Sequence, residues 1–338
     1  MKKKNFLIFL MFVFSGTLIY FVYKRIGVRE VWEKLSSFSL EGIFVILGIM
    51  GISHLIGIFR WQTILKNGKA KINFKNLVSS WFLSFSVTFF IPFILGAAET
   101  TRAYSLKRKE KKVSLKKSFS SVLIDKILEG TTSFLMIFLG VVFLILYSLS
   151  VSIEVWIFFL LFLIPIGAII YFYVRAFKSQ SMAKIVEKPL KKILNHRVKN
   201  VLEIEKEIFK FFELKNKKLR KSIGLALLRQ LIDFLACFSI LFFMGIKLTL
   251  PQAIAIIGFI YISYYLIPIP AAFGVLEIIQ ALVFTQIGFN PQAGVAFVLL
   301  FRSFNFVFAM LGVAFGFRSI LHWLGEKMLQ ISDKNNKA

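Results

Sequence analysis

Long apolar runs alternate with short basic segments along the chain. Three of the runs, Phe6–Tyr23, Gly42–Phe59 and Ile153–Val174, each offer at least 18 consecutive uncharged residues. That is roughly the length needed to cross ~30 Å of hydrocarbon. Because lipid offers the backbone no hydrogen-bond partner, segments of this kind must be helical. The pattern predicts an all-α polytopic membrane protein.

Composition supports this interpretation. Apolar residues make up 57% of the 338 residues and the mean hydropathy is +0.76, more apolar surface than a soluble fold of this length can bury. The lysines at the N-terminus precede an apolar run that lacks a small-residue cleavage site, so we expect this run to be retained as the first span. The chain is predicted to be a single membrane domain over residues 1–338, located in the cell membrane.

The basic residues predict the orientation. The segments Arg60–Lys75, Arg102–Lys117 and Arg175–Lys221 hold five, eight and fifteen lysines and arginines. If these segments and both termini face the cytoplasm, 35 of the 43 basic residues lie inside and five lie outside. This asymmetry follows the positive-inside rule. We therefore expect both the N-terminus and the C-terminus at the cytoplasmic face.

Two apolar stretches do not fit simple crossings. Basic segments flank Leu77–Ala98 on both sides, and Pro92 and Gly96 interrupt it, so it is predicted to enter the membrane and turn back. Ala253–Gly288 is interrupted in the same way and lies between two poorly charged loops. The expected architecture is about six transmembrane helices plus two re-entrant hairpins. Pairs of short tilted spans are the alternative.

The order of span, span, hairpin and span occurs twice. The first unit covers about residues 5–147 and the second about residues 153–317, and the two begin on opposite sides of the membrane. They are therefore candidate inverted-topology repeats, which in transporters place the substrate site near the midplane. Pro92-x-x-x-Gly96-x-x-Glu99 recurs with the same spacing as Pro270-x-x-x-Gly274-x-x-Glu277, which supports the repeat.

The basic connector over residues 175–221 interrupts the second unit. Apolar and charged residues alternate between Val201 and Phe212 in the manner of an amphipathic helix. We expect its cations to lie against anionic lipid headgroups at the cytoplasmic face. A solvated connector whose charges only set the topology is the alternative.

Ionisable residues within the apolar segments mark the candidate site, because each costs at least ~2.5 kcal/mol at the bilayer centre. They are Glu99, Arg102, Asp125, Lys126, Glu129, Arg229, Asp233, Glu277 and Arg302. Spacings of three and four residues place Glu99 with Arg102, and Asp125 with Glu129, on shared helix faces. Arg229 and Asp233 are expected to satisfy each other.

The helix that follows each break is predicted to begin near mid-membrane with unsatisfied N–H groups and a positive dipole end. Gly96 and Gly274 would let a phosphate approach these ends. Arg102, Lys126 and Arg302 would add charge-assisted contacts.

Glu99 and Glu277 lie in the first turn of these helices. They are predicted to gate the anion site. The alternative is that they cap the helices and pair permanently with Lys126 and Arg302.

Nothing in the sequence indicates a metal, a cofactor or an enzyme. His54, His196 and His322 lie far apart, and Cys237 has no second cysteine with which to pair. There is no phosphate-binding glycine loop, Gly-x-Ser-x-Gly elbow or His-Glu-x-x-His sequence.

Four segments together carry a family resemblance: PFILGAAETTRAY at 92–104, VLIDKIL at 122–128, IPIPAAFGVLE at 267–277, and a late arginine, Arg302. Over about residues 6–317 the chain resembles the membrane region of lysylphosphatidylglycerol synthases, the flippase-like family. The resemblance implies site roles for Glu99, Arg102, Asp125, Lys126, Gly274, Glu277 and Arg302. Two features depart from the family pattern, namely alanines at 271 and 272 in place of glycines and Lys126 in place of arginine.

Members that act as synthases carry a cytoplasmic aminoacyl-transfer domain after this region, and we expect this chain not to be a synthase. The resemblance implies translocation of a lipid across the bilayer, and the predicted anion site favours a phosphate headgroup. Because the sequence shows no ATP site, we expect transport to be downhill or coupled to an ion, with Glu99 or Glu277 as candidate proton carriers. A secondary transporter of a small anion and an accessory protein for a lipid or envelope enzyme are the alternatives. Membrane lipids are the expected partners, and nucleic acid is not.

Overall fold

The computed structural model describes residues 28–36, 38–66, 72–91, 96–147, 153–178, 180–181, 198–266 and 274–335. Within these ranges every regular element is an α-helix. Four of the helical segments are long and apolar enough to cross a membrane: Leu40–Leu65, Leu115–Leu146, Lys217–Phe243 and Pro291–Phe317. The all-α membrane class is thereby confirmed, whereas the number and direction of crossings stay predictions. The predicted first span, Phe6–Tyr23, lies outside the described residues.

Two series of four helices follow the same order. The first contains α3 (Leu40–Leu65), α4 (Phe74–Phe90), α5 (Ala97–Lys109) and α6 (Leu115–Tyr147), and the second α10 (Lys217–Phe243), α11 (Leu250–Leu266), α12 (Val275–Gln286) and α13 (Pro291–Asn335). Helices α4 and α11 both have 17 residues and begin at residues 74 and 250, which are 176 positions apart. Helices α6 and α13 begin at residues 115 and 291, again 176 positions apart. Each series thus consists of a long helix, a 17-residue helix, a break, a short helix and a second long helix.

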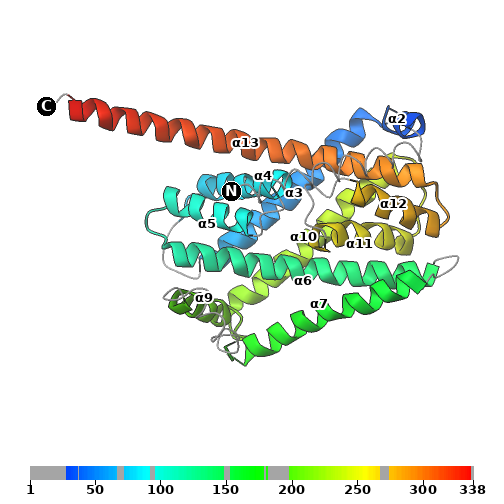
Figure 1. The fold of residues 1–338 in the computed structure, drawn as a ribbon, viewed down its shortest axis with the longest axis horizontal. Helices are drawn as coiled ribbons and strands as arrows, with labels where there is room; N and C mark the ends of the chain where they lie inside the picture. Colours follow the sequence, from blue (N-terminus) through cyan, green and yellow to red (C-terminus); the bar gives the residue numbers. More distant parts are fainter. Residues whose placement is uncertain are drawn as a thin grey trace, which may run out of the picture.

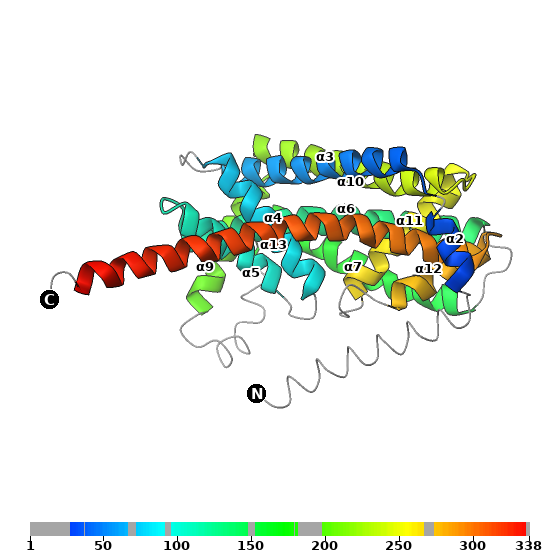
Figure 2. The ribbon, with the colours of Figure 1, turned by 90° about the horizontal axis from the view of Figure 1, so that it is seen from above.

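The helices of one series pack against helices of the other, and two of these contacts join corresponding pairs of helices. Helix α3 lies along α10, α6 packs on α11, and α4 packs on α13 (Figure 1). Seen from above, α3 and α10 form one edge of the molecule (Figure 2). Because α6 and α4 correspond to α13 and α11, these last two contacts are equivalent. This is the arrangement that a structural repeat produces, and its inversion across the membrane stays a prediction.

The contact between α6 and α11 depends on two glycines. A Cβ added at Gly140 would lie 2.8 Å from the Cα of Gly258, and one at Gly258 would lie 2.7 Å from the Cα of Gly140. Real Cβ atoms do not approach so closely, so only glycine permits the two backbones to meet here. Small residues at such crossings let membrane helices associate through close backbone packing.

The first predicted break separates two helices that fold back on each other. The Ser84 hydroxyl donates to the carbonyl of Ala98 at 2.9 Å, Ser80 and Ser105 join through their hydroxyls at 2.9 Å, and the Lys109 ammonium donates to Ser79 at 2.7 Å. As one residue number falls the other rises, so α4 and α5 are antiparallel. Pro92 itself lies outside the described residues, as do Pro268 and Pro270 of the second break.

Helix α4 is longer than one arm of the hairpin that the sequence predicts over Leu77–Ala98. It begins at Phe74 and its 17 residues span about 25 Å, which is close to the thickness of the hydrocarbon. A helix–break–helix arrangement is therefore observed on both sides of the repeat. Whether these pairs re-enter or cross the membrane stays a prediction.

The remaining helices are α2 (Val28–Ser36), α7 (Ile153–Phe177) and α9 (Val198–Phe211). Helix α7 covers the third apolar run of the sequence. Helix α9 is the described part of the amphipathic connector, and its Phe209 and Phe211 are buried in an apolar cluster shared with α6 and α7. The apolar face of α9 is thus covered by protein. Contact of its cations with lipid headgroups stays a prediction.

The three basic segments that the sequence placed on one side of the membrane meet in space. Lys116 at the start of α6 pairs with Glu203 of α9, and the Lys218 ammonium at the start of α10 donates to the carbonyl of Lys66, just after α3, at 2.5 Å. Their convergence at one region of the molecule agrees with a shared face. The side of the membrane to which that face belongs stays a prediction.

Candidate functional site

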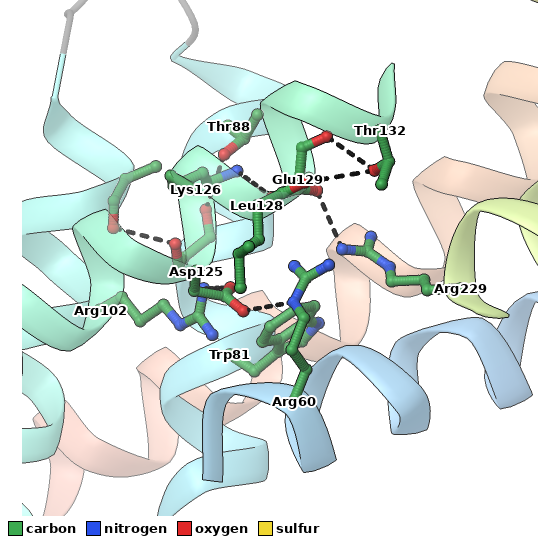
Figure 3. A network of polar contacts seen from close by, with 12 residues as sticks. Arg60, Trp81, Thr88, Arg102, Asp125, Lys126, Leu128, Glu129, Thr132 and Arg229 are labelled. Carbon is green, nitrogen blue, oxygen red and sulfur yellow. Dashed lines mark hydrogen bonds and ion pairs between the residues drawn. The ribbon is translucent and has the colours of Figure 1, made fainter. Parts of the chain in front are cut away.

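Asp125 of α6 lies at the centre of a buried charge network (Figure 3). Its Oδ1 accepts a hydrogen bond from Nε of Arg60 on α3 at 2.6 Å, and its Oδ2 accepts one from Nη1 of Arg102 on α5 at 2.8 Å. The side chains of Asp125, Arg60 and Arg102 are 0%, 1% and 3% exposed. One carboxylate therefore holds three helices together at a place without access to water.

Glu129 extends the network along the same face of α6. Its carboxylate lies 2.9 Å from the Lys126 ammonium and 2.9 Å from Nη1 of Arg229 on α10. Arg229 also lies 3.7 Å from Asp233, which accepts a hydrogen bond from Ser53 of α3. The expected pairing of Arg229 with Asp233 is confirmed. It is one contact of a larger network that joins α3, α5, α6 and α10.

The network carries an excess positive charge. Its described members comprise four bases (Arg60, Arg102, Lys126 and Arg229) and three acids (Asp125, Glu129 and Asp233), a formal charge of +1. Nη2 of Arg60 and both Nε and Nη2 of Arg102 are buried and have no hydrogen-bond partner among the described residues. Buried donors of this kind are rare because leaving one unsatisfied costs about 1–3 kcal/mol. The network thus has both the charge and the free N–H groups to accept an anion.

Two tryptophans hold the Arg102 guanidinium between them. Its Cζ lies 4.0 Å from the ring centroid of Trp61 on α3 and 4.1 Å from that of Trp81 on α4. The indole N–H of Trp61 donates to Ser121 at 3.0 Å, and that of Trp81 donates to Nδ1 of His54 at 3.2 Å. Both rings are therefore fixed in orientation. Stacking of this kind compensates a desolvated guanidinium while leaving its N–H groups, which lie in its plane, available for acceptors.

A second buried ion pair occurs in the other series. Arg302 of α13 donates through Nη1 to Glu277 of α12, and their side chains are 5% and 2% exposed. Oε2 of Glu277 also accepts a hydrogen bond from the backbone N–H of Gly274 at 2.9 Å, which caps α12. The cap and the pair expected for Glu277 as the alternative to gating are both observed. Gly274 has φ of 81°, a conformation in which an L side chain is strained.

The corresponding end of α5 is built differently. Gly96 again precedes the helix with positive φ, 76°, but no side chain caps it. Glu99 is half-buried and has no ion pair among the described residues, and Lys126 pairs with Glu129 instead. The expected pair of Glu99 with Lys126 is therefore not formed. Its role as a gate stays a prediction.

The two series thus share an ion pair between the short helix and the following long helix, with opposite polarity. Arg102 on α5 faces an acid on α6, whereas Glu277 on α12 faces a base on α13. Aromatic contacts connect the first pair to α13. Trp81 donates a hydrogen bond to His54, and the His54 ring centroid lies 4.6 Å from that of Phe308 on α13. Phe308 follows Arg302 by six residues, about 9 Å along the helix. Figures 1 and 2 show α5 and α12 apart along the long axis. A single site formed by both helix ends stays a prediction.

The sequence indicates most of the charged residues of the network, but neither Arg60 nor the aromatic residues around Arg102. Arg60 was counted among the cations of a cytoplasmic loop because it follows the apolar run to Phe59. The structure corrects this, because Arg60 lies within α3 and is 1% exposed. Arg102 was also counted with loop cations, although its spacing from Glu99 had marked it as a candidate. Trp61, Trp81 and His54 gave no signal, since aromatic residues are common throughout the chain.

Comparison with known proteins agrees with this architecture. Residues 8–312 match the family described as the lysylphosphatidylglycerol synthase transmembrane region. A UPF0104 membrane protein of Pyrococcus horikoshii is 22% identical over 319 residues, which cover 88% of this chain and 92% of that protein. Because the family match covers most of the chain, this membrane protein belongs to the lysylphosphatidylglycerol synthase transmembrane-region family.

Proposed function

We propose that the protein moves a lipid with an anionic, phosphate-bearing headgroup between the two leaflets of the cell membrane. The headgroup would bind at the Arg60–Arg102 network while the acyl chains remain in the bilayer. The proposal includes no synthase chemistry and no cofactor. Family membership supports a role at the membrane, and the network supports the chemistry of the headgroup.

The observation that carries this proposal is the set of unpartnered guanidinium donors in a network of formal charge +1. Three nitrogen atoms, Nη2 of Arg60 and Nε and Nη2 of Arg102, are buried and have no acceptor in the part of the chain that the structure describes. A phosphate diester offers two non-bridging oxygens that share one negative charge, which would satisfy such donors and neutralise the excess charge. Guanidinium groups suit phosphate because their N–H groups match its oxygens in pairs.

Access to this site requires movement of the helices. Arg60 and Arg102 are 1% and 2% exposed, so a headgroup reaches them only when α3, α5 or α6 separate. A repeat whose halves pack through equivalent contacts is suited to such movement, because one half can rock against the other. The site would then open toward each leaflet in turn.

The test is lipid movement in proteoliposomes that contain fluorescent phosphatidylglycerol, with the outer-leaflet fluorophore quenched chemically. The purified protein should increase the fraction of lipid accessible to the quencher above that of empty vesicles. Arg102→Gln should abolish most of the increase because it removes the charge and two of the free donors. Arg108→Gln, at an exposed position on the same helix, should not.

Two further variants separate the site from the function. Glu277→Gln and Arg302→Ala should also impair movement if the second ion pair takes part. Retention of full activity in both would exclude that pair from the site. No movement of phosphatidylglycerol or of a polyprenyl-phosphate lipid by the wild-type protein would refute the proposed function. Uptake of free phosphate into the same vesicles, without lipid movement, would instead favour a small-anion transporter.

A further inference from the structure

A separate cavity lies where the end of α3, the start of α6 and the end of α9 meet. Its volume is about 210 Å³, well above the ~10–15 Å³ that a single water requires by the same measure. A phosphate group and the glycerol attached to it fit in this space. The cavity is thus formed by segments far apart in the sequence, and no motif in the chain indicated it.

Part of the cavity lining is cationic. Lys117 of α6 and Lys210 of α9 line it together with Glu207 of α9. None of the three has an ion-pair partner among the described residues, so the two ammonium groups exceed the single carboxylate by one charge. The hydroxyls of Ser120 and Ser121 also line the cavity, and each now donates to a carbonyl of its own helix.

The rest of the cavity lining is apolar. Ile64 and Leu65 of α3, Ile124 of α6 and Phe211 of α9 line it, and all four are buried. A cavity lined by lysines and hydroxyls together with aliphatic and aromatic groups suits an amphiphile. Small-molecule sites commonly combine an apolar lining with a few polar groups that fix the orientation of the ligand.

A short chain of contacts joins this cavity to the buried network. Ser121 accepts a hydrogen bond from Trp61 at 3.0 Å, and Trp61 stacks on Arg102. Asp125 directly follows Ile124, and Arg60 lies one turn before Ile64. A ligand that draws the Ser121 hydroxyl toward the cavity therefore acts on the ring that holds Arg102.

From these observations we infer that the cavity between α3, α6 and α9 is a second anion site, which binds a phosphate group through Lys117, Lys210, Ser120 and Ser121. The phosphate is either free or part of a lipid headgroup. Binding at this site does not depend on the transport proposed above, so each can fail alone.

Location is tested by protection of a cysteine. Glu207→Cys places a thiol on the cavity wall and keeps both lysines, whereas Lys206→Cys places one at an exposed position outside the cavity. The native Cys237 is 3% exposed, so its background reaction with a maleimide is small. Dihexanoyl-phosphatidylglycerol or inorganic phosphate at ten times Kd should slow labelling of Glu207→Cys about tenfold. Labelling of Lys206→Cys should not change.

Affinity is tested with a matched pair of charge variants. Lys117→Gln/Lys210→Gln should weaken binding of the same probes on the order of 30-fold, from the usual strength of a lysine–headgroup contact. Lys112→Gln/Lys206→Gln removes the same net charge from exposed positions and should bind as wild type. Thermal unfolding of both variants shows that they are folded.

Each outcome decides the inference. Protection by both probes shows that the phosphate group itself is recognised, and protection by the lipid alone shows that the apolar wall contributes. Both results support the site and identify the source of the phosphate. Protection by neither probe, equal protection at Lys206→Cys, or equal weakening in both charge variants would overturn it. Lipid binding without lipid movement in vesicles would refute the transport proposal and leave this site intact.

Discussion

Replacement of Asp125 by asparagine tests whether one carboxylate holds the buried network together. Asp125 accepts from Arg60 at 2.6 Å and from Arg102 at 2.8 Å and is fully buried. Asparagine keeps its size and one acceptor oxygen. Its NH₂ group, however, would face one of the two guanidiniums, so that two donors oppose each other.

The expected loss follows from this geometry. One charge-assisted hydrogen bond disappears, which costs about 1.5–3 kcal/mol. The two guanidiniums also lose their shared counter-ion in a buried place, and breaking a buried pair in this way typically costs 3–5 kcal/mol in total. For a chain of this size a loss of about 1 kcal/mol lowers the unfolding midpoint by roughly 2 °C. We therefore expect Asp125→Asn to unfold about 6–10 °C below wild type.

The assay is thermal unfolding of the purified protein in detergent, followed by loss of the monodisperse peak in size-exclusion chromatography. The double variant Arg60→Gln/Asp125→Asn should recover part of the loss because it restores the excess charge of the network to +1. Glu33→Gln serves as the control, since its pair with Arg29 is exposed and contributes at most ~1 kcal/mol. A midpoint for Asp125→Asn within a degree of wild type, or a double variant no more stable than Asp125→Asn alone, would refute the reasoning.

Substitutions at three other places test separate parts of the structure. Gly140→Ala should lower the unfolding midpoint, at an overpacking cost of about 1–3 kcal/mol, because the added Cβ would meet the backbone of α11. The control is Gly130→Ala on the same helix. Its added Cβ has no atom within 4 Å, so this variant should be neutral or slightly stabilising. Glu277→Ala should destabilise the protein more than Glu277→Gln in the same assay, because glutamine can still cap α12 and alanine cannot. Equal losses of stability in the two variants would show that only the charge of Glu277 matters. Trp61→Phe and Trp81→Phe should each keep most of the stacking on the Arg102 guanidinium but lose an indole hydrogen bond. Tryptophan fluorescence and lipid movement should therefore change while the fold is retained. A fall in the unfolding midpoint as large as that of Asp125→Asn would contradict a positioning role.

The helical architecture followed from the sequence because lipid constrains the backbone so strongly. The apolar run Gly42–Phe59 lies in α3 and the uncharged part of Ile153–Val174, from Val155 on, lies in α7, since an uncharged segment of this length has no other stable form in hydrocarbon. The repeated spacing of Gly96 with Glu99 and of Gly274 with Glu277 indicated two equivalent helix starts. Gly96 and Gly274 each lie directly before a helix, and both have a positive φ, a conformation that residues with a side chain rarely adopt.

The sequence also identified most of the charged residues of the site, because an ionisable group in an apolar run is costly and therefore conspicuous. It could not assign their partners. Asp125 binds Arg60, which is 65 residues away in the chain, and Glu129 binds Arg229, which is 100 residues away. No local spacing rule reaches that far.

Residue types and runs thus determined by themselves that this chain is a helical membrane protein with two equivalent breaks and a set of buried charges. Only the tertiary structure decided that Arg60 belongs to the site, that two tryptophans hold Arg102, and that Glu277 and Arg302 form a pair with polarity opposite to that of Arg102 and Asp125. The physical reason is the range of the forces involved. Insertion into lipid acts on each segment alone, whereas charge pairing and stacking depend on which helices meet.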